Sequence, residues 1–446
     1  MEIAIKLSQF LLSLSLLIIL HELGHFIPAK IFKTKVEKFY LFFDVKYSLF
    51  KKKIGETVYG IGWLPLGGYV KIAGMIDESM DKEQMAQPPK PWEFRSKPAW
   101  QRLIIMLGGV TVNFILAIVI YIGMAWAYGD LFIKNNDVSD GVWVTSPLAE
   151  EIGFKTGDKI ISINGETIEN FNDVPRRLFF AKNVVVEREG NSKTLTMPVN
   201  LIEKAAAEKT PLVALRIPFV IGQVDGASAN KDVLQKGDLI TSLNGETVKY
   251  FDQAKDILEK HKGQDITATV IRKEKNEMLS LNVSPEGKLG VVQGGVKLEN
   301  YDKLGYYNVS KHEYSFFESI PAGLTRSKNE VVGYFEQLKA IISPETGAYK
   351  SVGGFYAIFD IFPNTWSWQT FWGITAILSI MLGVMNLLPI PALDGGHVMF
   401  LLYEMITGRK PSDKFMEYAQ MAGFFILIAL LLFANGNDIY KGIMGK

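Results

Sequence analysis

Cysteine is absent from this 446-residue chain, and histidine occurs only five times. The lack of cysteine excludes disulfide bonds, thiolate nucleophiles and cysteine-ligated zinc. Basic and acidic residues are nearly balanced, 48 against 47, so the chain has no charge excess of the kind that attracts nucleic acid. Any metal site must therefore use histidine, aspartate or glutamate, and no DNA or RNA partner is expected.

Apolar residues, in contrast, make up 48% of the chain and form several long uncharged runs. One run begins at residue 7 and continues through HELGH, giving about 25 helix-compatible residues, enough to cross ~30 Å of hydrocarbon. A cleaved signal peptide is the alternative, but this run leads into ionisable residues instead of a small-residue cleavage site. Further runs lie at 103–128, 371–388 and 421–433, and the last is short enough to be a buried amphipathic helix instead. We predict an α-helical membrane protein with four transmembrane helices.

Lysine and arginine gather in two of the connecting loops. They include Lys33, Lys35, Lys38, Lys51, Lys52, Lys53, Arg95, Lys97 and Arg102 in the first loop, and Arg409, Lys410 and Lys414 in the last. Because such residues are retained on the cytoplasmic side of short loops, both loops are expected in the cytoplasm. Four crossings then place both termini and the stretch at 130–369 outside.

An internal repeat occupies that outer stretch. Residues 157–166 read GDKIISINGE and residues 237–246 read GDLITSLNGE, 80 positions apart. Each copy predicts a strand followed by an Asn-Gly hairpin turn, and then a helix at 171–181 or 251–261. The pattern resembles PDZ domains, which capture peptides by strand addition to a sheet edge. A rigid pair of domains that only blocks access is the equally open alternative.

The stretch at 36–76 has aromatic and β-branched residues interrupted by LPLGGYV, with Gly67 and Gly68 after Pro65. It predicts short strands or hairpins on the cytoplasmic side, followed by a flexible loop at 80–92. An ordinary surface sheet is one interpretation. A sheet that dips into the membrane is the other, and its open edge could then pair with an extended substrate near Gly67 and Gly68.

Two of the five histidines, His21 and His25, are one helical turn apart, so their imidazoles can converge on one ion with Glu22 beside them. Ionisable residues at the end of an apolar helix are costly in a bilayer and usually serve a site. The alternative is that the helix ends at Leu20 and HELGH lies in the aqueous headgroup layer. The HExxH pattern predicts a zinc site with Glu22 as the general base of peptide hydrolysis.

A catalytic zinc ion usually has a third protein ligand, which must come from elsewhere in the chain. Asp394 is the best candidate, because it lies in an apolar stretch interrupted by Pro389 and Pro391 and then by Gly395 and Gly396. His397 is its rival, since imidazole binds zinc well. Asn386 is a candidate hydrogen-bond donor to the substrate backbone or the oxyanion, or a polar contact between helices.

The motifs HELGH, PLGGYV, FRSKPAWQR, the tandem repeat and NLLPIPALDGGH occur in an order that resembles the bacterial site-2 protease family of intramembrane zinc metalloproteases. The resemblance implies that His21, His25 and Asp394 bind Zn2+, that Glu22 is catalytic, and that Asn386, Pro389 and Pro391 are active-site neighbours. One departure is Val110, which stands where the family has a proline, and it puts only local packing or gating in doubt.

The resemblance also implies partners and a location. The expected substrates are single-span membrane proteins already trimmed outside, such as anti-sigma factors, and signal-peptide remnants, cleaved in regulated intramembrane proteolysis with a role in the envelope stress response. The expected location is the bacterial cytoplasmic membrane, with PDZ domains on the periplasmic side as a size filter or peptide-binding pair. A membrane-anchored PDZ scaffold and a protease of soluble peptides are the competing hypotheses.

The expected organisation begins with a first transmembrane helix at 1–34, a membrane-associated β region with a loop at 35–99 and a second transmembrane helix at 100–129. Two PDZ domains of α+β type follow at 130–211 and 212–298, and then a linker and amphipathic helix at 299–345. The chain is expected to end with a third transmembrane region at 346–410 and a fourth transmembrane helix with a C-terminal tail at 411–446.

Overall fold

The computed structural model describes residues 2–65, 67–75, 87–208 and 210–443. The chain divides into two compact units, the first comprising residues Met1–Gly129, Glu313–Ile342 and Val352–Lys446, and the second comprising residues Asp130–His312 and Ser343–Ser351. Most of the flexible loop expected at 80–92 lies outside the described residues.

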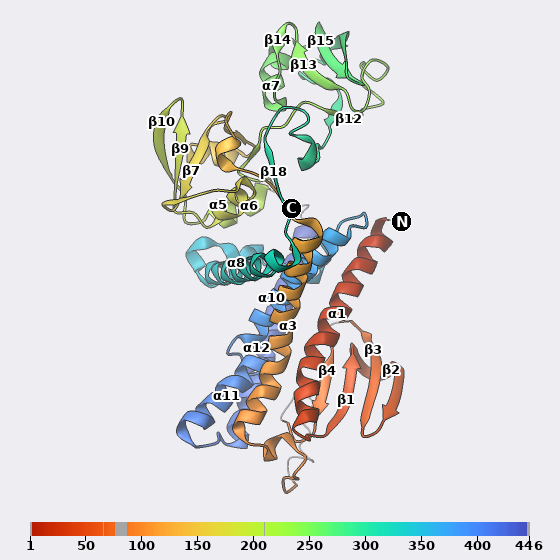
Figure 1. The fold of residues 1–446 in the computed structure, drawn as a ribbon, viewed down its shortest axis with the longest axis vertical. Helices are drawn as coiled ribbons and strands as arrows, with labels where there is room; N and C mark the ends of the chain where they lie inside the picture. The colour runs from red at the N-terminus through yellow and green to blue at the C-terminus, as the bar shows by residue number, and fades with distance from the viewer. Residues whose placement is uncertain (1, 66, 76–86, 209, 444–446) are drawn as a thin grey trace. The chain divides into compact units, whose positions relative to one another are not determined.

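The first unit is a bundle of apolar helices (Figure 1). Among the described residues, four helices are long and apolar enough to cross a membrane, as predicted: α1 (Glu2–Ile31), α3 (Ala99–Tyr128), α10 (Trp368–Leu387) and α12 (Asp413–Ile443). The unit also contains α8 (Phe316–Ile342), α9 (Phe355–Asp360) and α11 (Asp394–Thr407). Helix α8 lies across α3 and α10 (Figure 1).

Helix α12 is longer than the apolar run at 421–433 and is not the buried amphipathic helix considered as the alternative. Only 11% of the most apolar 18-residue stretch of α12 is buried inside the protein, and the side chains of Phe425 and Leu432 are 64% and 65% exposed. An apolar surface of this extent is stable in contact with lipid rather than water.

The ends of the four long helices are arranged as an even number of crossings requires. The start of α1 and the end of α12 lie at one end of the bundle (Figure 1). The end of α1, the start of α3 and the link from α11 to α12 lie at the other, where the basic loops are concentrated.

A four-stranded sheet lies beside α1 in the same unit (Figure 1). It consists of β1 (Val36–Leu41), β2 (Phe43–Ile54), β3 (Thr57–Leu64) and β4 (Tyr69–Ile72), in the order β2-β3-β1-β4. Strands β1 and β3 are parallel, and the other two pairs are antiparallel. Strand β4 is hydrogen-bonded to β1 on one side only, so its other edge is free of strand partners within the described residues. The predicted strands at 36–76 are thereby confirmed.

The second unit contains the internal repeat, and both copies fold alike. The strands are β7 (Lys159–Ile163), β8 (Glu166–Thr167), β9 (Asn183–Arg188) and β10 (Asn191–Thr196) in the first copy, and β13 (Leu239–Leu243), β14 (Glu246–Thr247), β15 (Asp265–Arg272) and β16 (Lys275–Asn282) in the second. Corresponding strands follow the same order, β10-β9-β7-β8 and β16-β15-β13-β14. The predicted helices are α5 (Val174–Phe179) and α7 (Phe251–Lys260).

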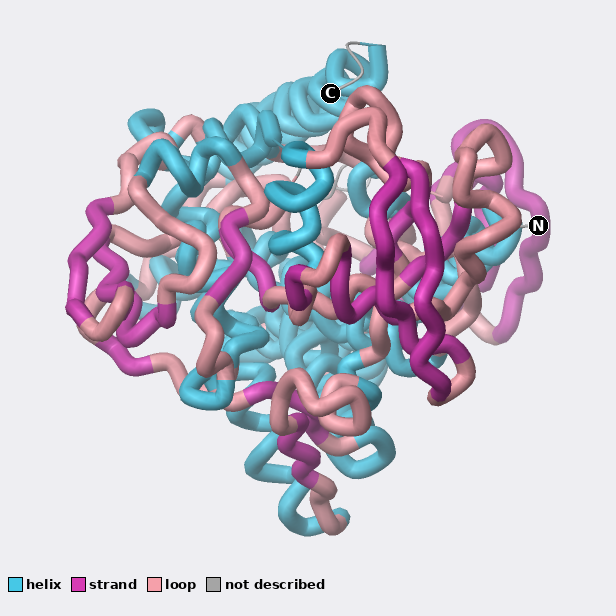
Figure 2. The backbone as a smooth tube through the Cα atoms, turned by 90° about the horizontal axis from the view of Figure 1, so that it is seen from above, coloured by secondary structure: helices cyan, strands magenta, loops and turns pink. Residues whose placement is uncertain are grey.

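Two-stranded pairings and short helices complete the second unit. The pairs are β5 (Asp130–Ile133) with β18 (Val309–His312), β6 (Val142–Val144) with β11 (Val213–Leu215), and β12 (Ile221–Val224) with β17 (Val291–Gln293). The helices are α4 (Pro147–Ile152) and α6 (Leu201–Glu208). Figure 2 shows that the strands form separate small sheets rather than one continuous sheet.

The repeated sequence signals have local structural causes. The Asn-Gly turns have positive φ at both residues, 53° and 83° at Asn164 and Gly165 and 50° and 82° in the second copy, which suits the twist of a tight hairpin. The buried Asp158 accepts two hydrogen bonds from Arg188, at 2.6 and 2.7 Å, and Asp238 pairs with Arg272 in the same way. This ion pair raises the pKa of each arginine. The aspartate of each Gly-Asp pair is therefore explained by this ion pair, which the spacing alone did not reveal, and the glycine by its positive φ of 98° in the first copy and 95° in the second.

Candidate metal centre

The HELGH motif lies inside α1. The helix does not end at Leu20 but continues to Ile31, so the interpretation that places HELGH beyond the helix is wrong. His21 and His25 are 8% and 7% exposed and lie one turn apart on the face that packs against α3.

Asp394 is the first residue of α11. Helix α10 ends at Leu387, and a loop containing Pro389 and Pro391 leads to α11. The prediction that Gly395 and Gly396 interrupt the helix is wrong, because both lie in its first turn. A Cβ at Gly395 would overlap the carbonyl of Leu387, so the glycines instead let the loop fold closely onto the start of α11.

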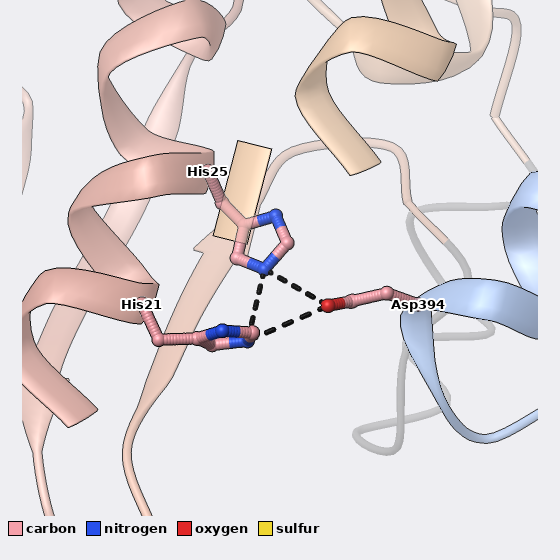
Figure 3. A group of neighbouring side chains, drawn as sticks. All are labelled: His21, His25 and Asp394. Carbon is pink, nitrogen blue, oxygen red and sulfur yellow. Dashed lines mark hydrogen bonds and ion pairs between the residues drawn. The ribbon is translucent and has the colours of Figure 1, made fainter. Parts of the chain in front are cut away.

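The structure brings His21, His25 and Asp394 together (Figure 3). The Oδ2 atom of Asp394 lies 3.4 Å from Nε2 of His21 and 3.3 Å from Nε2 of His25, and the two Nε2 atoms are 3.3 Å apart. All three side chains point toward one centre from two separate helices.

These distances fit a zinc ion. Zinc binds nitrogen and oxygen at about 2.0–2.2 Å with tetrahedral angles, so neighbouring ligand atoms should be roughly 3.3–3.5 Å apart. The Asp394 Oδ2 atom is also buried without a hydrogen-bond partner within the described residues, which is costly unless a cation is bound. His397 is also buried, but it is not part of this three-residue group.

Two groups on α3 orient the imidazoles. Nδ1 of His25 lies 2.8 Å from the backbone carbonyl of Ile105, so Nδ1 carries the proton and Nε2 keeps its lone pair for a metal. The side-chain amide of Asn113 lies 3.0 Å from Nδ1 of His21. The Asn113 oxygen has no hydrogen-bond partner among the described residues, and with the amide turned by 180° it would accept a hydrogen bond from the Nδ1–H of His21. Sequence reasoning missed both contacts.

Glycines let α3 approach α1 at the metal centre. A Cβ atom at Gly24 of HELGH would overlap the carbonyl of Gly108, and one at Gly108 would overlap the carbonyl of Gly24. A Cβ at Gly109 would overlap Nε2 of His25 and lie 2.7 Å from Cε1 of His21. Val110, which stands at the family's proline position, is buried within an uninterrupted α3.

We expect Gly109→Ala to lower zinc affinity, roughly ten- to a hundredfold, because the added methyl group must displace an imidazole that is held in place by Ile105. Zinc content after dialysis against a graded chelator measures the effect. Gly123→Ala is the matched control on α3, since a Cβ there meets no atom within 4 Å. It should retain zinc and gain about 0.5–1 kcal/mol of helix stability. Equal zinc affinity in the two variants would contradict the expectation.

A cavity of about 520 Å³ adjoins the three side chains. Its walls include Glu22 of α1, residues 68–72 around β4, residues 392–394 at the start of α11, and Gln420 of α12. The carboxylate of Glu22 has the backbone N–H of Val70 as a hydrogen-bond partner. The general-base candidate and the free strand edge therefore face the same space.

The other predicted site residues lie near this cavity with different contacts. The Asn386 amide is 3.4 Å from Nε2 of His21. Gly68 lines the cavity, and a Cβ there would lie 3.5 Å from Cγ of Glu22, whereas Gly67 is next to the ring of Phe43. Pro389 and Pro391 belong to the loop between α10 and α11. Neither proline is among the described residues that line the cavity.

Comparison with known proteins gives consistent matches over nearly the whole chain. A sequence profile described as Peptidase family M50 matches residues 9–430. A protein of Rickettsia conorii is 28% identical over 96% of this chain and 97% of its own length. Proteins of Campylobacter jejuni and Clostridium perfringens are 29% and 28% identical, over 99% and 97% of this chain and 95% and 98% of their own lengths. Each of the three carries the name "Putative zinc metalloprotease".

Proposed function

The chain belongs to Peptidase family M50, the site-2 protease family of zinc metalloproteases, and from that premise we propose that it cleaves transmembrane segments of single-span membrane proteins within the bilayer. The observation that carries the proposal is the position of the His21, His25 and Asp394 cluster, which lies on α1 and at the start of α11, among helices apolar enough to cross a membrane.

His21, His25 and Asp394 are the proposed zinc ligands. A zinc ion held by these three residues would supply Lewis acidity toward a water molecule and the scissile carbonyl. Glu22, on the same helix as the two histidines and lining the cavity, takes the water proton and transfers it to the leaving amine. His25 and His21 are held for this task by Ile105 and Asn113.

The free edge of β4 supports binding of an extended substrate. A transmembrane helix has its backbone hydrogen bonds satisfied internally, so it must unwind before the peptide group can be attacked. Strand addition to β4 would supply new partners for the exposed N–H and C=O groups close to Glu22. Gly68 is a proposed substrate contact because it lines the cavity, while its missing side chain makes room for Ile18 and the carbonyl of Tyr40.

The loop between α10 and α11 is the second proposed substrate contact. Pro389 and Pro391 keep residues 388–393 out of helical structure, and irregular backbone at membrane depth is tolerated where it lines a polar cavity. Asn386, 3.4 Å from His21, is suited to donate a hydrogen bond to the substrate carbonyl or oxyanion.

The two repeats support a filtering role. We propose that they are PDZ domains on the periplasmic side of a bacterial cytoplasmic membrane, where they exclude untrimmed proteins or bind peptides. The basic loops lie at the end of the helical bundle where α3 begins, whereas the chain continues into the repeats from the other end of α3, and this connectivity supports the orientation. Trimmed anti-sigma factors and signal-peptide remnants are the proposed substrates, in regulated intramembrane proteolysis linked to envelope stress.

The proposal is tested by comparing cleavage of a membrane-embedded substrate with cleavage of the same sequence as a soluble peptide. The purified protein in liposomes should cut a tagged, trimmed single-span protein whose transmembrane segment contains helix-breaking residues, and mass spectrometry should locate the cut inside that segment. Replacing those residues by leucine should slow cleavage at least about tenfold, because unwinding becomes more costly.

Two other results would favour a different function for this protein. Equal cleavage of the same sequence as a soluble peptide would indicate a protease acting at the membrane surface. Zinc binding without cleavage of any trimmed substrate would favour a membrane-anchored scaffold.

A further inference from the structure

A buried amide on α12 faces the reaction cavity. Gln420 is 4% exposed and lines the same cavity as Glu22 and the β4 edge. It is the one described α12 residue that does so, and one turn further along the helix Phe424 and Phe425 are 37% and 64% exposed. A polar side chain turned inward from a lipid-facing helix indicates a site.

The direction of Gln420 is set by a close backbone contact. A Cβ at Gly423 would lie 2.7 Å from the backbone nitrogen of Ala392 and 3.0 Å from the carbonyl carbon of Pro391. Helix α12 therefore packs directly on the loop that precedes Asp394. Residues three apart share one helix face, so Gln420 is held on the side of the metal centre.

The Gln420 amide is available for a ligand. Among the residues that the structure describes, its side chain has no hydrogen-bond partner, although it offers two N–H donors and a carbonyl acceptor. Gln420 lines the cavity, and its polar atoms are not among the fully buried atoms without a partner, which include the oxygen of Asn113. Leaving such a group unpaired lowers stability, which a substrate contact would offset.

A peptide backbone is the chemistry that fits. In an extended chain the N–H and C=O of one residue point to the same side, and alternate residues point to opposite sides. A substrate paired with β4 along one edge would expose unpaired groups along its other edge, in an apolar surrounding. One primary amide can accept from the N–H and donate to the C=O of a single residue.

We propose that Gln420 binds the backbone of the substrate on the edge not paired with β4, and so positions the scissile segment between β4 and α12. This inference rests on the proposed intramembrane cleavage. It makes Gln420 a substrate-contacting residue that is independent of sequence preference, because every residue except proline presents both backbone groups.

Gln420→Met tests the inference, since methionine keeps the length and removes the hydrogen bonds. We expect kcat/KM for a trimmed single-span substrate to fall roughly ten- to a hundredfold, chiefly through KM, with full zinc content. The melting temperature should stay the same or rise, because an unpaired buried amide is lost. A structural role would lower it instead. Tyr418→Phe is the control, as this hydroxyl lies on a residue that is 68% exposed.

A binding measurement separates this inference from the proposed function. In a Glu22→Gln background, which we expect to bind the substrate without cutting it, Gln420→Met should weaken photocrosslinking to the substrate by the same factor. Wild-type kcat/KM in Gln420→Met, or a loss of activity that follows a loss of zinc or a lower melting temperature, would overturn the inference while leaving the protease intact. Failure of the wild type to cut any trimmed substrate would overturn both.

Discussion

Glu22→Gln should abolish measurable cleavage while leaving zinc bound. Glutamine has the shape of glutamate and keeps the cavity filled, but it cannot take a proton from water, so kcat should fall by about 10²–10⁴-fold. The zinc content should not change, because the three clustered atoms belong to His21, His25 and Asp394. Cleavage of a tagged single-span substrate and metal analysis of the same preparations measure both quantities.

Glu56→Gln is the matched control for this substitution. Glu56 lies at the turn between β2 and β3, with a side chain that is 55% exposed and pairs with Lys30 on the surface. It should retain both activity and zinc. Substantial cleavage by Glu22→Gln would show that another group acts as the base, and the assignment of Glu22 would have to be given up.

Asp394→Asn should lose zinc and, with it, cleavage. A neutral amide oxygen is a weaker ligand than a carboxylate, and the two imidazoles alone leave the ion incompletely held. The fall in zinc affinity should exceed the roughly 10–100-fold caused by changes to groups behind the ligands. Competition with a chelator of known affinity measures it.

His397→Asn is the informative comparison for Asp394→Asn. His397 lies one turn further along α11, is buried and lines the cavity, yet it is outside the group formed by Asp394 and the two HELGH histidines. Its replacement should leave zinc bound. Loss of zinc from His397→Asn with retention in Asp394→Asn would reassign the third ligand to His397.

Much of the fold follows from local patterns. Three apolar runs long enough to cross a bilayer and a shorter one at 421–433 predicted the four long helices, and Asn164-Gly165 with its counterpart at 244–245 predicted two hairpins. The i, i+4 spacing placed His21 and His25 on one face of a helix. These features depend on residues close together in the sequence, where backbone geometry alone relates position to direction.

Other local patterns were misread. Gly395 and Gly396 were expected to interrupt a helix, because glycine is a poor helix former. In the structure they lie in the first turn of α11, where the absence of a side chain allows the preceding loop to return over it. Close packing outweighed intrinsic propensity at this point.

By itself, the sequence determined the ionisable residues available for a metal, the helix that presents two of them, and the repeat. Only the tertiary structure decided that Asp394 rather than His397 comes within 3.4 Å of both imidazoles, that Ile105 and Asn113 orient those rings, and that Gln420 reaches the cavity. The physical reason is that these contacts join helices far apart in the chain. They depend on how closely α3, α11 and α12 pack around α1, which is set by backbone contacts at glycines and not by any local periodicity.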